Sequence, residues 1–436
     1  VLVYDQTCAA EKRRRRKRGR FPDPAVRVFI NEAVCEGCGD CSVKSNCLAV
    51  VPVETEFGRK RAIDQSACNK DYSCEKGFCP SFVSVLGGSM KKGRGLADSA
   101  DDSFGVPPAP TLGSTTTPYG MLITGVGGTG VVTIGALIGM AAHLDGRGVS
   151  VLDMAGMAQK GGAVYSHVRI ADRPGDLHAT RIGHGEADSL IGGDLVVSAG
   201  IECLSRVRSG HTRAVINCAA IPTADFARNP DWQFPGDEMQ NAIRIAVGDS
   251  DCDILDARQI ATRLLGDSIA TNPFLLGFAW QKELVPVSLA SLERAIELNG
   301  TEVEMNLAAL LWGRRAAIDL YRVRCCADPA SSVDHQPPTL DQLIDISADF
   351  LSGYQDAACA ARHRELVDRV RHCEAAFGST TLTEAVARGY RKLLAYKDEY
   401  EVARLYCDPA FWRELDETFE GDYRVRFHPV SYTHLR

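Results

Sequence analysis

Seven of the 16 cysteines lie between Cys35 and Cys79, a density at which thiols serve as metal ligands or as disulfide partners. The first three follow a C-x2-C-x2-C spacing, so their thiolates can converge from one tight loop onto one iron–sulfur cubane. Gly37 and Gly39 allow the backbone to fold closely around the sulfide corners. No secretion signal is recognisable, so we expect metal ligation rather than disulfides. The seven are Cys35, Cys38, Cys41, Cys47, Cys68, Cys74 and Cys79.

The pair Cys79-Pro80 resembles the end of a bacterial-type ferredoxin run, where the last cysteine crosses to the other cluster. The resemblance implies a ferredoxin-like domain with one [4Fe–4S] cluster on Cys35, Cys38, Cys41 and Cys79. It assigns most of a second site to Cys47, Cys68 and Cys74. That second site is either absent, three-iron, or completed by a distant ligand such as Cys8. Zinc held by paired cysteine knuckles and inert buried thiols are the alternatives.

A glycine-rich loop forms a second candidate site. It lies between an expected strand and an expected helix, which is the context of a dinucleotide-binding or phosphate-binding loop. Asp153 ends the next expected strand, near the place of a ribose-binding acid. The alternative is a tight turn without a ligand. The candidate cofactor-binding glycines of this loop are Gly125, Gly127, Gly128 and Gly130.

Gly161 and Gly162 form a second glycine patch, which leads into a further strand. We include both as candidate cofactor-binding residues, although such pairs are often only turns. Lys160, Ser166 and Arg169 could reach an anionic ligand there. His167 and His184 could exchange protons, but a single histidine is more often structural. No catalytic residue is assigned.

Apolar periodicity predicts an α/β fold class, with a mostly parallel sheet and helices on its faces, followed by a mostly helical region. Strands are expected at residues 121–124, 149–153, 164–170, 194–198 and 213–217. Helices are expected at residues 254–265, 273–282, 289–298, 302–322, 340–353, 357–373 and 382–406.

We divide the 436 residues into segments by composition. The first carries seven consecutive cationic residues, Lys12 to Arg18, interpreted as a solvated segment with nucleic-acid or acidic-partner binding as the alternative. The net charge of −7 gives no global attraction to nucleic acid, and no apolar stretch is long enough to cross a membrane. The expected segments are 1–27 (basic linker from an upstream domain), 28–88 (cysteine domain), 89–118 (linker), 119–250 (Rossmann-like domain), 251–429 (helical region) and 430–436 (non-native tail).

Several motifs in this order resemble the fused indolepyruvate:ferredoxin oxidoreductases, a family of 2-oxoacid:ferredoxin oxidoreductases. The resemblance rests on Asp5 to Lys12, Cys35 to Cys41, Asn69 to Cys74 and Gly77 to Phe82. The Gly125–Gly130 loop, with Gly161-Gly162 and Ser166 to Arg169, looks like the gamma domain of that family. The remaining helices resemble its C-terminal extension.

This resemblance implies a thiamine-diphosphate-dependent oxidation of a 2-oxoacid such as indolepyruvate to an acyl-CoA, with electrons leaving through the iron–sulfur cluster to ferredoxin. Thiamine diphosphate and Mg²⁺ would sit in other domains of the same full-length chain, and coenzyme A would be a co-substrate at the gamma glycine loop. A cytoplasmic homo-oligomer is expected.

The sequence departs from that family pattern in one respect that bears on activity. We find no Gly-Asp-Gly run of a thiamine site, and the sequence opens without an initiator Met, so we expect the thiamine domains to lie upstream. We therefore predict no oxoacid oxidation by this chain alone. Two rival functions are an NAD(P)-linked iron–sulfur oxidoreductase using Asp153, and a non-catalytic zinc-bearing scaffold that binds nucleic acid through the basic run.

Overall fold

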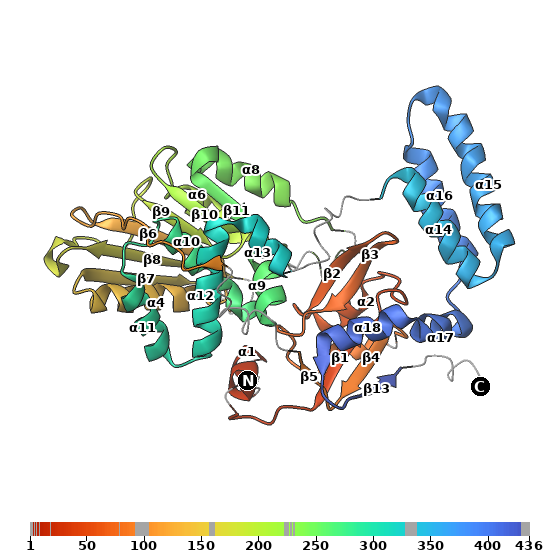
Figure 1. Cartoon of the computed structure of the whole chain (residues 1–436), viewed down its shortest axis with the longest axis horizontal. Coiled ribbons are helices and arrows are strands. Elements are labelled where there is room, and N and C mark those ends of the chain that lie inside the picture. Colours follow the sequence, from red (N-terminus) through yellow and green to blue (C-terminus); the bar gives the residue numbers. More distant parts are fainter. Residues whose placement is uncertain are drawn as a thin grey trace. The chain divides into compact units, whose positions relative to one another are not determined.

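The computed structural model describes residues 3, 5, 7, 9–17, 19–77, 79–91, 104–156, 162–221, 226, 229, 232–327 and 338–428. The chain forms two compact units, whose elements are labelled in Figure 1. One joins Val1–Met90, Ala227–Pro230 and Asp334–Arg436, and the other comprises Lys91–Phe226 and Asp231–Val333. Cys8, Lys160, Gly161 and the expected non-native tail lie outside the described residues.

The second unit is built on a six-stranded sheet in the order β11-β10-β9-β6-β8-β7. β8 is antiparallel to both of its neighbours, and the other pairs are parallel. The prediction of a mostly parallel sheet in an α/β unit is therefore confirmed. The strands are β6 (Tyr119–Val126), β7 (Gly148–Ala155), β8 (Ala163–Ala171), β9 (Ser189–Gly192), β10 (Arg213–Asn217) and β11 (Cys252–Leu255).

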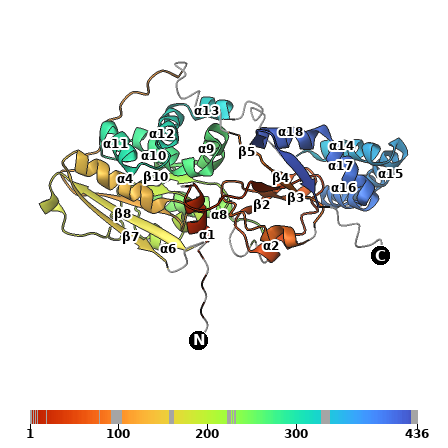
Figure 2. The same ribbon diagram turned by 90° about the horizontal axis from the view of Figure 1, so that it is seen from below.

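Helices cover both faces of this sheet because side chains alternate along each strand. On β6, Met121 and Ile123 belong to one apolar core and Leu122 to the other. Figure 2 shows α4 lying along β7 and β8. The first core contains α4 (Val131–Leu144), α9 (Ala257–Leu265), α10 (Thr271–Gln281), α11 (Leu289–Asn299), α12 (Val303–Ile318) and α13 (Leu320–Ala327). The second contains α5 (Leu195–Ser198), α6 (Ile201–Leu204) and α8 (Gly236–Val247).

One expected strand is a helix. Residues 194–198 read as a buried strand because Leu-Val-Val is apolar and its two valines are β-branched. Instead, Asp194 caps helix α5 by accepting the Val197 N–H at 2.8 Å. The strand at this place is β9, which ends two residues earlier. The Asp194 carboxylate, which follows two glycines, favours the start of a helix here over the local strand propensity.

Helices α10 and α12 approach each other through glycine. A Cβ on Gly277 would lie 2.0 Å from the Leu310 carbonyl oxygen, and one on Gly313 would lie 1.9 Å from that of Phe274. The two backbones are therefore in contact, and this crossing closes the apolar core behind the sheet.

The first unit has a three-stranded antiparallel sheet in the order β1-β4-β13 and a separate hairpin, β2-β3. β13 comes from the C-terminal end of the chain and lies beside β4 in Figure 1. The strands are β1 (Val26–Ile30), β2 (Val50–Thr55), β3 (Gly58–Ile63), β4 (Phe82–Leu86), β5 (Ser89–Met90), β12 (Phe419–Glu420) and β13 (Arg424–Phe427).

The helices of this unit come from both ends of the chain. Phe57, at the tip of the β2-β3 hairpin, packs on Phe350 with ring centroids 5.2 Å apart, and the Arg391 guanidinium lies 4.0 Å from the centroid of the Phe57 ring. The cysteine domain and the C-terminal helices thus share one packed unit. The helices are α1 (Ala9–Lys17), α2 (Asp40–Ser45), α14 (Leu340–Tyr354), α15 (Ala357–Glu374), α16 (Thr381–Leu394), α17 (Glu399–Cys407) and α18 (Pro409–Thr418).

This grouping differs from the segments drawn from composition. The expected helical region 251–429 is divided, with its first part on the large sheet and its last part on the cysteine domain. Helical periodicity shows which faces are buried but carries no information on which core they join. Among the described residues, no helix is long and apolar enough to span a membrane.

Candidate metal centre

Four of the predicted ligands gather in one place. Cys35 follows β1, Cys38 and Cys41 lie before and within the first turn of α2, and Cys79 precedes β4. Burial raises the pKa of the Cys41 thiol to about 11, and Cys35, Cys79 and Cys38 are each close enough to raise it further. The thiols of Cys35, Cys38 and Cys79 are therefore neighbours of the Cys41 thiol.

The loop between these cysteines requires glycine. Gly37 has a φ of 72°, and a Cβ there would lie 2.2 Å from the Arg59 carbonyl oxygen. This close approach lets the Gly37 N–H donate to Cys35 Sγ at 3.3 Å. On the other segment, Ser81 Oγ lies 3.0 Å from Cys79 Sγ. Polar groups thus already contact two of the four sulfurs.

The second predicted set also comes together. Burial raises the pKa of the Cys74 thiol to about 12, and Cys47 and Cys68 are the next causes. The Lys70 N–H donates to Cys68 Sγ at 3.4 Å. Each group thus takes its last cysteine from the other run, Cys79 for the first and Cys47 for the second, which is the exchange seen in two-cluster ferredoxins. That either group binds metal stays a prediction.

The donor set fits an iron–sulfur cluster. Both groups offer thiols, with N–H or hydroxyl groups on the sulfurs, and such hydrogen bonds help set cluster potentials. Among the described residues, no three Cys, His, Asp or Glu side chains meet at the spacing of a single bound ion. A cubane binds one thiolate at each of its four irons, so its cysteine ligands lie farther apart than those of a single metal ion.

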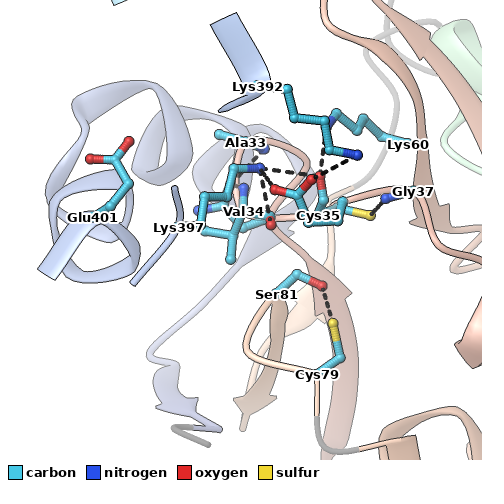
Figure 3. Close-up of polar contacts among 12 residues, drawn as sticks. Ala33, Val34, Cys35, Gly37, Lys60, Cys79, Ser81, Lys392, Lys397 and Glu401 are labelled. Carbon is cyan, nitrogen blue, oxygen red and sulfur yellow. Dashed lines mark hydrogen bonds and ion pairs between the residues drawn. The ribbon is translucent and has the colours of Figure 1, made fainter. Parts of the chain in front are cut away.

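Cations surround the first thiol group. Arg61 is only 1% exposed, and it is near enough to Cys41, Cys35 and Cys38 to interact electrostatically with all three. Lys60 Nζ donates to the Cys35 carbonyl oxygen at 2.7 Å, and burial lowers the pKa of that lysine to about 8. Figure 3 shows Lys60 and Lys397 both reaching this carbonyl, Lys397 from the C-terminal part of the chain. These charges would offset the negative charge of a cluster.

The basic run holds the second thiol loop, a role that sequence reasoning missed. Its residues Lys12 to Lys17 lie in helix α1 rather than in a solvated tail. Arg13 Nη1 donates to the Ala67 carbonyl oxygen at 2.9 Å, and Arg16 Nη1 donates to that of Asn69. These carbonyls flank Cys68. A guanidinium can bind loop carbonyls as readily as an anionic partner, and charge density alone does not distinguish the two.

The glycine loop lies where predicted, at the end of β6 and the start of α4. Gly128 and Gly130 have φ values of 93° and 104°, as a tight strand-to-helix turn needs. The loop is held from inside by Asp194, whose buried carboxylate accepts the Val126 N–H at 2.6 Å. The Gly127 N–H donates to the Gly162 carbonyl oxygen at 2.8 Å, so the two predicted glycine patches are neighbours.

Asp153, the acid predicted to bind a ribose, does not lie on the strand next to the glycine loop. Asp153 lies near the C-terminal end of β7, whereas the glycine loop follows β6, and β8 runs between these two strands. In a dinucleotide-binding half the corresponding two strands are adjacent. Asp153 is therefore one strand too far from Gly125 to pair with that loop as the fingerprint requires.

The two histidines behave as structural or surface residues. His167 is 1% exposed, and its Nδ1 accepts the Ile182 N–H at 3.2 Å. Burial, with the nearby Arg181 and Arg206, lowers the pKa of His167 to about 4. His184 is exposed. Neither arrangement indicates a proton-transfer site.

Two parts of the chain are similar to known protein families. Residues 120–316 match the family described as "Pyruvate ferredoxin/flavodoxin oxidoreductase", and residues 340–431 match a "Family of unknown function (DUF6537)". The "Indolepyruvate oxidoreductase subunit IorB" of Methanothermobacter thermautotrophicus is 28% identical over 203 residues, which are 46% of this chain and 98% of that protein. The subunit of the same name from Archaeoglobus fulgidus is 29% identical over 204 residues, covering 45% and 94%.

A solved structure also aligns with the chain. The keto/oxoacid ferredoxin oxidoreductase gamma subunit from Geobacter sulfurreducens covers 46% of this chain and 98% of its own, with a TM-score of 0.33 and 21% identity. The similarity in sequence is the stronger finding. Through residues 120–316 the chain is similar to the 2-oxoacid:ferredoxin oxidoreductases, the family that its sequence resembles.

Proposed function

We propose that this chain is the electron-transfer and gamma-domain portion of a thiamine-diphosphate-dependent 2-oxoacid:ferredoxin oxidoreductase of the indolepyruvate type. The observation that carries the proposal is the convergence of Cys35, Cys38 and Cys41 with Cys79. The named relatives are subunits of an oxidoreductase, which supports further subunits or domains as partners.

A [4Fe–4S] cluster bound to these four thiolates would supply one-electron transfer. The residues of the chain have separate tasks around it. The Gly37 N–H and Ser81 hydroxyl bind sulfur, and the buried Arg61 balances charge. Decarboxylation of the oxoacid, electron transfer to ferredoxin and acyl transfer to coenzyme A belong to the complete enzyme. Thiamine diphosphate and Mg²⁺ would be held in its other domains.

The cluster is tested by anaerobic reconstitution with iron and sulfide, followed by metal analysis and electron paramagnetic resonance. We expect iron and acid-labile sulfide in equal amounts and a brown absorption. A folded protein that takes up zinc and no iron would contradict the proposal and favour the zinc scaffold. Addition of indolepyruvate to the loaded chain should give no reduction until thiamine domains are supplied.

We further propose that the glycine loop faces the phosphates of coenzyme A, since backbone N–H groups at a helix start suit anions. Replacing Gly127 by Val should weaken coenzyme A binding in a calorimetric titration of the full chain, and unchanged affinity would remove this role. NADH titrated in parallel should not bind, because Asp153 is separated from the loop by β8.

A further inference from the structure

The C-terminal domain matches a family over residues 340–431, and its described part, residues 340–428, contacts both chain segments that carry the first thiol group. Tyr406 Oη donates to the Pro80 carbonyl oxygen at 2.6 Å, next to Cys79. On the other segment, Lys397 Nζ donates to the carbonyl oxygens of Val34 and Cys35 at 3.3 and 3.4 Å. The two segments are far apart in sequence, and one domain holds them both.

Lys397 is positioned to act through its charge. Its side chain is 13% exposed, and its ammonium pairs with Glu36 at 2.7 Å. Lys60 approaches the same Cys35 carbonyl from the cysteine domain at 2.7 Å. Lys392 lies 3.6 Å from the other oxygen of Glu36 but is mostly exposed, so water screens its charge more fully. Figure 3 shows these lysines gathered over Cys35.

We propose that residues 340–431 form the second wall of the cluster site, in which Tyr406 and Lys397 clamp the two cysteine segments and Lys397 raises the reduction potential of the cluster. This inference rests on the proposed cluster at Cys35, Cys38, Cys41 and Cys79. It proposes a function for residues 340–431, which match a family described as being of unknown function.

The direction of the effect follows from charge. Reduction adds one negative charge to the cluster, and a nearby ammonium in a partly buried site stabilises that form more than the oxidised one. Glu36 acts in the opposite sense. Removing Lys397 should therefore make reduction harder, and removing the Glu36 charge should make it easier. Lys397 is a positioning residue, since it touches the Cys35 carbonyl and not the sulfur.

The test is a potentiometric titration of the reconstituted 436-residue chain, in which electron paramagnetic resonance reports the reduced cluster. We expect the midpoint potential to shift negatively in Lys397→Met and positively in Glu36→Gln. Lys397→Arg, which keeps the charge, should stay near wild type. Arg364→Met serves as the matched control, because this cation of the same domain pairs with Asp345 on a neighbouring helix.

Iron content, measured first, separates the two proposals. A wild-type chain without iron would overturn the proposed cluster and this inference together. Equal iron in all variants with unshifted potentials would overturn this inference alone. If Lys397→Met loses the cluster altogether, the other two variants decide. A positive shift in Glu36→Gln with none in Lys397→Arg would support the charge effect, and equal shifts in both would count against it.

Discussion

The hydroxyl of Tyr406 lies 2.6 Å from the carbonyl oxygen of Pro80, linking residues 326 positions apart at the turn that carries Cys79. Through this bond the C-terminal domain reaches the segment that must cross over to complete the four-cysteine group. This hydrogen bond can be removed by itself. The Tyr406 ring otherwise packs on Phe411 and Phe427, and a phenylalanine at position 406 would keep those ring contacts.

Tyr406→Phe should destabilise the first unit by about 1 kcal/mol, the usual net contribution of one hydrogen bond, because this bond is only partly buried. We expect faster iron release to a chelator, read from the loss of cluster absorbance. Tyr423→Phe is the control, since its hydroxyl binds Asp416 away from the cysteines. Equal release rates in the two variants would argue against the Tyr406 contact.

Gly37→Ala should prevent assembly of the first cluster. The left-handed backbone alone costs about 1–2 kcal/mol, and the added Cβ would overlap the Arg59 carbonyl oxygen, 2.2 Å away. The loop must then move, taking the N–H from Cys35 Sγ. Iron per chain measures the effect. Gly77→Ala, where a Cβ meets nothing within 4 Å, should bind iron normally.

Gly313→Ala should destabilise the second unit by about 1–3 kcal/mol, the usual cost of overpacking. Its Cβ would lie 1.9 Å from the Phe274 carbonyl oxygen, so α10 and α12 would have to separate. Chemical denaturation gives the loss. Gly175→Ala, at an open position, should unfold like wild type, and a similar midpoint for both would show that the crossing has room.

Acidification should weaken the second unit through His167. Its folded pKa is about 4, below the value of about 6.5 in an unfolded chain. Between these pH values the unfolded chain binds more protons, so stability is full above about pH 6.5 and falls as the pH drops toward 4. His167→Asn does not titrate and should show a shallower fall in denaturation midpoint. Parallel curves would mean that His167 becomes protonated without cost.

The cysteine groups were predictable because ligand spacing is a local signal. A C-x2-C-x2-C run with glycine between its cysteines describes one loop, and Cys79-Pro80 is typical of a ligand that crosses to the other cluster, a role that stays a prediction here. The strand before Gly125 and the helix after it were predictable for the same reason.

Other features depend on contacts that no local pattern encodes. β13 pairs with β4 across more than three hundred residues, and the antiparallel β8 separates Asp153 from the glycine loop. A run of arginines reads as solvated, and only the folded chain shows carbonyls within reach of Arg13 and Arg16. Strand order and helix partners are set by long-range packing.

Whether Cys79 joins Cys35, Cys38 and Cys41 around one cluster is measured by the iron content and paramagnetic signal of Cys79→Ser. Cys407→Ser is the control, because Cys407 is an exposed thiol outside both groups. After anaerobic reconstitution, Cys79→Ser should lose the [4Fe–4S] signal while Cys407→Ser keeps it. A Cys79→Ser protein with wild-type iron and an unchanged signal would show that Cys79 is not a ligand of the cluster.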